Sequence, residues 1–188
     1  MNFWIKKSTI AESLAESVNK LIKKYGLDRA LVEAAATNQN EVVQILLTNT
    51  NINVNKPEPY GQTALMWAAS AGYNSVVQTL LTAKDIDVGT VDYFGQTALM
   101  LAAANGQNEV IQTLLTAKGI NVNMADRYGS TALIFACSNN QISTVQILLA
   151  VKDIDVNAIS RSGMTALMFA DQKGHQQIVQ CLKAAGAL

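Results

Sequence analysis

The stretch GQTALMLAAANGQNEVIQTLLTAKGINVNMADRY, residues 95–128, decides the fold. Shifted back by 34 positions it matches residues 61–94 at most places, including GQTALM and QTLLTAK, and shifted forward it matches residues 129–162. A weaker copy opens at Ala30, and a shortened copy runs from Gly163. Self-similarity at a fixed period of this length predicts an array of stacked units. We expect repeats at about residues 28–60, 61–94, 95–128, 129–162 and 163–188.

Each repeat predicts two short helices joined by a tight turn. In the unit that opens at Gly61, Thr63 is a candidate N-cap for the first helix, because its hydroxyl can accept from a free backbone amide. Gly72 permits the positive φ needed where that helix ends, and Asn74 or Ser75 begins the second helix. Helices this short are marginal alone and become stable by stacking. The expected fold is therefore all-α, an α-solenoid of about five helix-turn-helix units.

Residues 1–27 lie outside the repeat and predict one amphipathic helix, which starts near Ser8 or Thr9 as N-cap and stops at Gly26. One interpretation is a capping helix over the exposed end of the first repeat. The other is a helix that binds a partner or a membrane surface, but its mixed charge argues against the membrane. The lid would also include the apolar residues Phe3, Trp4 and Ile5.

The repeats carry three recurring motifs. They are the G-x-T-A-L openings at Gly61, Gly95, Gly129 and Gly163, the V-V/I-Q-x-L-L second helices, and the I-x-V-N tails at Asn55, Asn123 and Asn157. On these motifs the chain resembles the ankyrin repeat family over residues 28–188. Tetratricopeptide repeats share the period, but their pattern of a Trp, a Leu-Gly pair and a Tyr is absent. The resemblance implies a non-enzymatic protein-binding module that contacts its partner with the concave face and the hairpin tips.

Two departures from that family stand out. The family's T-P-L-H becomes T-A-L-M or T-A-L-I, which removes a histidine that links neighbouring loops, so we expect less rigid hairpins. One extra residue, near Lys84, Lys118 or Lys152, is expected to bulge out after the second helix. A short chain of T-A-L-M repeats is similar to bacterial ankyrin proteins, which include effectors delivered into host cells.

The last repeat has polar residues where the others are apolar. Asp171 follows Ala170, and Lys183 follows Leu182. Burying such charges inside an array would cost several kcal/mol, whereas a terminal unit that faces water accepts them. We therefore expect residues 163–188 to cap the stack and the chain to be a complete small solenoid.

Composition excludes several classes of protein. The net charge is zero, only 15% of residues are charged and there is one histidine, which argues against nucleic-acid binding. The chain has no run of about 18 apolar residues that would span a membrane. Lys6 and Lys7 follow the first apolar residues, the wrong order for a secretory signal, so we expect a cytoplasmic protein. Cys137 and Cys181 lie in apolar helical patterns and are predicted to be small buried residues.

No catalytic or metal-binding pattern is present. His175 follows Gly174 at a turn where the resembling family uses a structural histidine, and no carboxylate or cysteine partner lies at a telling spacing. The D-I-D pairs at Asp85 and Asp153 lack the glycine and the distal glutamate of a calcium-binding loop. We expect no enzyme activity, no cofactor and no metal.

The repeat frame places two rows of side chains on the surface. One row, on the hairpin tips, comprises Tyr60, Phe94 and Tyr128 with their neighbours Pro59, Tyr93, Arg127 and Arg161. The second row, on the first helices, comprises Trp67, Leu101, Phe135 and Phe169. Aromatic residues and arginine are enriched in protein interfaces. The alternative is that one or both rows pack between neighbouring repeats.

Three functions compete on these observations. The leading hypothesis is a monomeric module that binds an unidentified protein through Tyr60, Trp67, Tyr93, Phe94, Leu101, Arg127, Tyr128, Phe135 and Arg161. The second hypothesis is a structural or self-associating repeat protein that assembles through the N-terminal helix. A bacterial effector that acts on a host protein is compatible with both hypotheses. An enzyme is the third, with His175 as its one candidate that titrates near neutrality.

Overall fold

The computed structural model describes residues 2–188, with side chains from Glu12 onward, so the predicted contacts of Phe3, Trp4 and Ile5 lie outside the described residues. A long helix, α1 (Asn2–Tyr25), is followed by five helix pairs. The pairs are α2 (Leu27–Ala36) with α3 (Asn40–Leu47), α4 (Ala64–Ala71) with α5 (Asn74–Leu81), α6 (Ala98–Ala104) with α7 (Asn108–Leu115), α8 (Ala132–Ser138) with α9 (Ile142–Leu149), and α10 (Ala166–Gln172) with α11 (Gln176–Ala184). The predicted all-α solenoid is confirmed.

The threonine of each T-A-L motif caps a first helix. The hydroxyl oxygen of Thr63 accepts a hydrogen bond from the amide of Met66, and Thr97, Thr131 and Thr165 make the same contact in their repeats. Each hydroxyl satisfies one of the amides that a helix start leaves unpaired. Helix α4 then ends at Gly72, whose φ of 79° lies in the left-handed region, as the sequence predicted.

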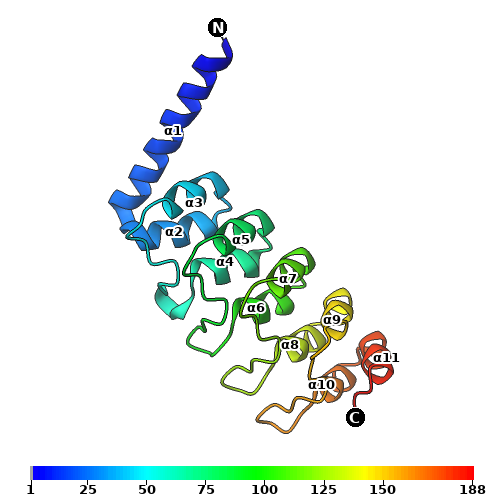
Figure 1. The fold of residues 1–188 in the computed structure, drawn as a ribbon. Helices are drawn as coiled ribbons and strands as arrows, with labels where there is room; N and C mark the ends of the chain where they lie inside the picture. Colours follow the sequence, from blue (N-terminus) through cyan, green and yellow to red (C-terminus); the bar gives the residue numbers. More distant parts are fainter. Residues whose placement is uncertain (1) are drawn as a thin grey trace.

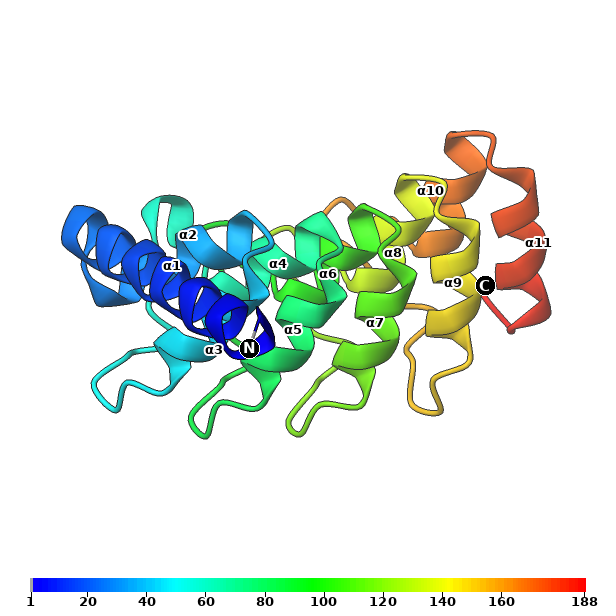
Figure 2. The same ribbon diagram turned by 90° about the horizontal axis from the view of Figure 1, so that it is seen from above.

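The helix pairs stack in two rows. Helices α2, α4, α6, α8 and α10 form the inner row, in which each helix contacts the next, and α3, α5, α7, α9 and α11 form the outer row (Figures 1 and 2). The core runs between the rows without a break. The paired small residues, such as Ala102 and Ala103, are completely buried and let neighbouring inner helices approach closely. The five units therefore share one core.

Side-chain amides link consecutive repeats at the outer loops. Asn55 donates from Nδ2 to the carbonyl of Asp85 and accepts at Oδ1 from the amide of Asp87. Asn123 makes the equivalent pair of hydrogen bonds with Asp153 and Asp155. The repeat between them has Gly89 at this position, so one link of the series is missing.

Helix α1 packs on the first repeat with its C-terminal half. Val18 is buried, Leu14, Leu21 and Ile22 pack against the core, and the helix contacts α2 and α3. Its N-terminal end extends away from the stack (Figure 1). The predicted start near Ser8 or Thr9 is wrong, because the helix already begins at Asn2. We keep the division at residue 27, with a capping helix before it, as a proposal.

The last helices show both a confirmed prediction and a partial error. Asp171 and Lys183 are exposed, as expected for residues on the end of the stack. Cys137 is completely buried in α8, whereas Cys181 on α11 is only half-buried. The prediction that both cysteines are buried is therefore wrong for Cys181, which occupies the position of α11 that Ile147 occupies, also half-buried, in α9.

Replacing Leu99 with alanine tests the shared core. Leu99 is 1% exposed in α6, the central inner helix. We expect Leu99→Ala to lower the free energy of unfolding by about 2–5 kcal/mol, because it leaves a cavity between tightly packed helices. Chemical denaturation measures the loss. A loss below about 1 kcal/mol would contradict the packing described here.

Replacing Gly89 with asparagine should restore the missing link. The Gly89 amide donates to Asp87 Oδ1, as the Asn55 amide donates to Asn53 Oδ1, so the local backbone already has the required turn. We expect Gly89→Asn to raise the free energy of unfolding by about 1 kcal/mol through new contacts with Gly119 and Asn121. Gly89→Ala is the matched control, because it removes the same glycine flexibility without adding an amide. Equal stability of the two variants would refute the link.

Candidate functional site

Four tight hairpins project from one edge of the stack in a row (Figure 1). In each, the amide of the first residue donates to the carbonyl of the last, and we call them finger 1 (residues 58–62), finger 2 (92–96), finger 3 (126–130) and finger 4 (160–164). Each finger joins one helix pair to the next, so its position is fixed by the stacking of the pairs.

Backbone hydrogen bonds join each finger to the next one. The amide of the second residue in a finger donates to the carbonyl of the third residue in the finger before it. The three bonds are Tyr93 N to Tyr60 O at 3.0 Å, Arg127 N to Phe94 O at 2.9 Å, and Arg161 N to Tyr128 O at 2.8 Å. These bonds are independent of the histidine that the T-A-L-M motif lacks.

This close contact explains the opening glycines Gly61, Gly95 and Gly129, which are each followed by another finger. At Gly95 the φ is 82°, and a Cβ atom would lie only 2.8 Å from the amide nitrogen of Arg127 in the next finger. Any other residue would strain its own backbone and push the fingers apart. Pro59 occupies the donor position in finger 1, where no earlier finger offers an acceptor, so the missing N–H leaves nothing unpaired.

Buried aspartates hold the tips of fingers 2 and 3. Asp92 Oδ1 accepts from the amides of Phe94 and Gln96 at 2.8 and 2.9 Å. Asp126 makes the same two contacts in finger 3. Finger 1 has Glu58 at this position, and its carboxylate contacts helix α2 instead.

The tip residues are open to solvent. The exposed fraction is 69% for Tyr60, 60% for Tyr93, 50% for Phe94 and 62% for Tyr128. Arg127 and Arg161 are also exposed. The tip row therefore does not pack between neighbouring repeats. Aromatic rings stand on fingers 1 to 3, and guanidinium groups stand on fingers 3 and 4.

The row on the first helices divides into two kinds of position. Trp67 is 40% exposed, whereas Leu101, Phe135 and Phe169 are half-buried and pack against the core. The half-buried side chains stabilise the stack and keep only part of their surface available. Trp67 is thus the most exposed side chain of this row.

Sequence reasoning missed a third row, on the stems that lead into the fingers. Val91 is 43% exposed and Ile159 is 64% exposed. Pro57 and Ala125 are exposed at the equivalent positions. All four stand four residues before the opening glycines, so the repeat frame could have identified them.

A pocket of about 340 Å³ lies where finger 1 meets the inner row. Its lining residues come from α2, finger 1 and α4, and they are Arg29, Val32, Glu33, Ala36, Glu58, Pro59, Tyr60 and Trp67. The Nε of Arg29 lies 3.3 Å from Glu58 Oε2 and 3.7 Å from Glu33 Oε1. The pocket therefore combines two predicted site residues, Tyr60 and Trp67, with charged residues that the sequence analysis did not select.

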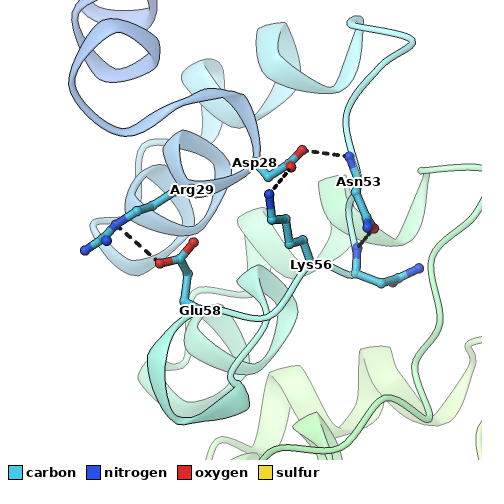
Figure 3. A network of polar contacts seen from close by, with 6 residues as sticks. Asp28, Arg29, Asn53, Lys56 and Glu58 are labelled. Atoms are coloured by element: carbon cyan, nitrogen blue, oxygen red, sulfur yellow. Dashed lines mark hydrogen bonds and ion pairs between the residues drawn. The ribbon is translucent and has the colours of Figure 1, made fainter.

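A second set of contacts holds the chain that leads into finger 1 (Figure 3). Asp28, in the first turn of α2, accepts from the amide of Asn53 and from Lys56 Nζ, both at 2.9 Å. Partial burial favours a higher pKa for the Asp28 carboxyl, but the hydrogen bonds from Asn53 and Lys56 outweigh it and hold the pKa below its usual value. Together with the Arg29–Glu58 contact, they fasten finger 1 to α2 (Figure 3).

Groups that could carry out chemistry are dispersed. Among the residues that the structure describes, no three His, Cys, Asp or Glu side chains gather as a metal site would require. The D-I-D aspartates make turns, since Asp87 and Asp155 accept from the amides of Gly89 and Asn157. Burial, with a smaller effect of Cys181, raises the pKa of the Cys137 thiol to about 12, which keeps it protonated at neutral pH.

Comparison with known proteins agrees with this geometry. The chain matches the family described as ankyrin repeats (3 copies) over residues 7–92, 31–126, 80–160 and 99–187. The chain belongs to the ankyrin repeat family, whose members are generally non-enzymatic protein–protein interaction modules. A search of curated proteins gave no match. Within residues 2–188, no helix has the length and apolar character to cross a membrane.

Neutralising Asp28 should loosen finger 1 in a pH-dependent way. The folded pKa of Asp28 lies below its unfolded value, so its contribution to stability is present above pH about 4 and is lost as the pH falls through the folded pKa. We expect Asp28→Asn to destabilise the protein at pH 7 and to have a smaller effect near pH 3, as measured by denaturation. Asp171→Asn, at an exposed residue, is the control. A pH-independent difference would argue against the Asp28 contacts.

Proposed function

We propose that this protein is a non-enzymatic binding module that holds a partner protein against its concave face and fingertips. The observation that supports this proposal most directly is the row of exposed tip residues Tyr60, Tyr93, Phe94 and Tyr128. Hydrogen bonds between the fingers hold the backbone that carries them. Exposed aromatic rings on a rigid support bury a large area on binding and lose little conformational freedom. Trp67, Leu101, Phe135, Arg127 and Arg161 complete the proposed surface.

The stems extend this surface. Val91 and Ile159 add apolar area beside the tips of fingers 2 and 4. Exposed apolar area beside exposed aromatic rings is typical of protein interaction sites. We propose that the partner contacts stems, tips and the exposed ring of Trp67 together.

Removing two tip rings tests the proposal. Phe94→Ala with Tyr128→Ala should change the free energy of unfolding by no more than about 0.5 kcal/mol per site, because both rings are exposed. The double variant should lose the partner proteins that the wild-type chain captures, as measured by affinity capture and mass spectrometry. Ile45→Ala, at an exposed apolar residue of outer helix α3, is the control and should retain them. Capture that survives the double variant would sink the assignment of the face.

Self-association is the second candidate, and the extension of α1 beyond the stack favours it. We expect the whole chain to be monomeric, which light scattering on the full chain and on a chain lacking residues 1–27 would check. A dimer that dissociates on removal of residues 1–27 would support the structural role instead.

We also propose a cytoplasmic location, with delivery into a host cell if the protein is an effector. Cys137 and Cys181 are both free thiols, as is usual for proteins of reducing compartments.

A further inference from the structure

The partly exposed carboxylates of the proposed binding surface and the arginines that pair with no described residue lie at its opposite ends. Glu33 and Glu58 lie at the finger 1 end, beside Arg29. Arg127 and Arg161 lie on fingers 3 and 4, where neither side chain makes an ion pair or a hydrogen bond with a described residue. Asp92 and Asp126 occupy the position of Glu58 in fingers 2 and 3, but they are buried and accept hydrogen bonds from backbone amides.

The finger 1 pocket retains capacity to accept hydrogen bonds. The Nε of Arg29 lies 3.3 Å from Glu58 and 3.7 Å from Glu33, and both distances exceed the 2.7–2.9 Å typical of a charge-assisted hydrogen bond. Glu58 Oε1 and Glu33 Oε2 therefore keep free lone pairs. The Glu58 side chain is only 14% exposed, so its charge is poorly screened by water. Among the lining residues, the two carboxylates outnumber the one guanidinium, while Lys56 and Lys24 lie outside the lining and interact with Glu58 and Glu33 over a longer range.

Aromatic rings form the rest of the wall. Tyr60 and Trp67 both line the pocket, and they are 69% and 40% exposed. Ring faces attract cations, and tryptophan does so most strongly. Arg29 makes one such cation–π contact at this end of the molecule, because its guanidinium lies 5.3 Å from the centre of the Tyr25 ring. An aromatic wall beside partly free carboxylates suits a lysine or arginine side chain.

The other end of the surface favours the opposite charge. The backbone amides of Arg127 and Arg161 are held by fingers 2 and 3, which fixes where the two side chains start. A free guanidinium presents a planar fork of donors that matches a carboxylate.

We infer that the partner presents a segment with a basic side chain for the finger 1 pocket and acidic side chains for Arg127 and Arg161. The inference rests on the proposed function, since it assigns chemistry to the same face. Neighbouring helices pack about 10 Å apart, so finger 1 lies roughly 20–30 Å from fingers 3 and 4. An extended chain advances about 3.3 Å per residue, so the basic and acidic residues are separated by roughly six to nine positions.

Selection from a random peptide display library tests the charge order. The library is panned on immobilised wild-type protein, on Glu33→Gln/Glu58→Gln and on Arg127→Gln/Arg161→Gln. Peptides that bind wild type should carry a Lys or Arg and, six to nine residues away, an Asp or Glu. The first variant should lose the basic preference alone, and the second should lose the acidic preference alone.

A double-mutant cycle on one synthetic selected peptide makes the test quantitative. Replacing its basic residue with Gln should weaken binding roughly tenfold to wild type and leave binding to Glu33→Gln/Glu58→Gln nearly unchanged. If the double variant unfolds, Glu33→Gln alone serves, because it leaves the Arg29–Glu58 contact intact. Equal weakening on both proteins would overturn the pocket assignment.

The outcomes separate this inference from the proposed function. Peptides that require Phe94 and Tyr128 but show no charge order would overturn the inference and leave the binding face in place. If the library yields no peptide whose binding depends on Phe94 and Tyr128, the proposed face itself fails, and the inference fails with it.

Discussion

Burial of each helix pair against the next is the constraint on which the whole molecule depends. A pair of helices of seven to ten residues each cannot bury its own apolar side. The inner helices solve this with completely buried alanines where they meet, such as Ala68, Ala102 and Ala136, which bring their backbones close. That spacing recurs along the stack, and it also sets the distance between the loops that join one helix pair to the next.

The fingers are a consequence of this spacing. Because each helix pair is set close to the next, the hairpins between them lie near enough for the backbone bonds from Tyr93, Arg127 and Arg161 to form. The close approach of the fingers requires glycine at Gly61, Gly95 and Gly129, and it leaves the side chains at the tips exposed. Core packing thus produces a hydrogen-bonded row of fingers. Because the tip side chains are exposed, they can vary without disturbing the core, as a binding surface requires.

The repeat period made most of the fold predictable. Thr63, Gly72 and Asn74 were placed correctly, because a cap, a left-handed turn and a helix start are local events that recur in phase. The start of α1 was placed incorrectly. Ser8 or Thr9 could cap a helix only if the residues before it were not helical, and α1 already begins at Asn2. The half-buried state of Cys181 recurs at the equivalent residues Thr113 and Ile147 of the interior repeats, so comparison of the repeats indicates it although the local apolar pattern does not.

The site was predictable in outline alone. The repeat frame identified Tyr60, Phe94 and Tyr128 as equivalent, but the contact of Arg29 with Glu58 joins residues from different repeats and breaks the pattern. Finger 1 differs because Glu58 replaces the aspartate that braces fingers 2 and 3, and one methylene changes which group the carboxylate reaches. Residues that differ between the repeats, such as Glu58, therefore give finger 1 contacts that the other fingers lack.

The most direct measurement of this account is native-state hydrogen exchange at the fingers. The amides of Tyr93, Arg127 and Arg161 should exchange slowly, because each donates to the finger before it, whereas the amides of Val91 and Ile159, which donate to no described residue, should exchange quickly. Exchange at the three finger amides as fast as at Val91 and Ile159 would contradict a linked row of fingers supported by the stacked repeats.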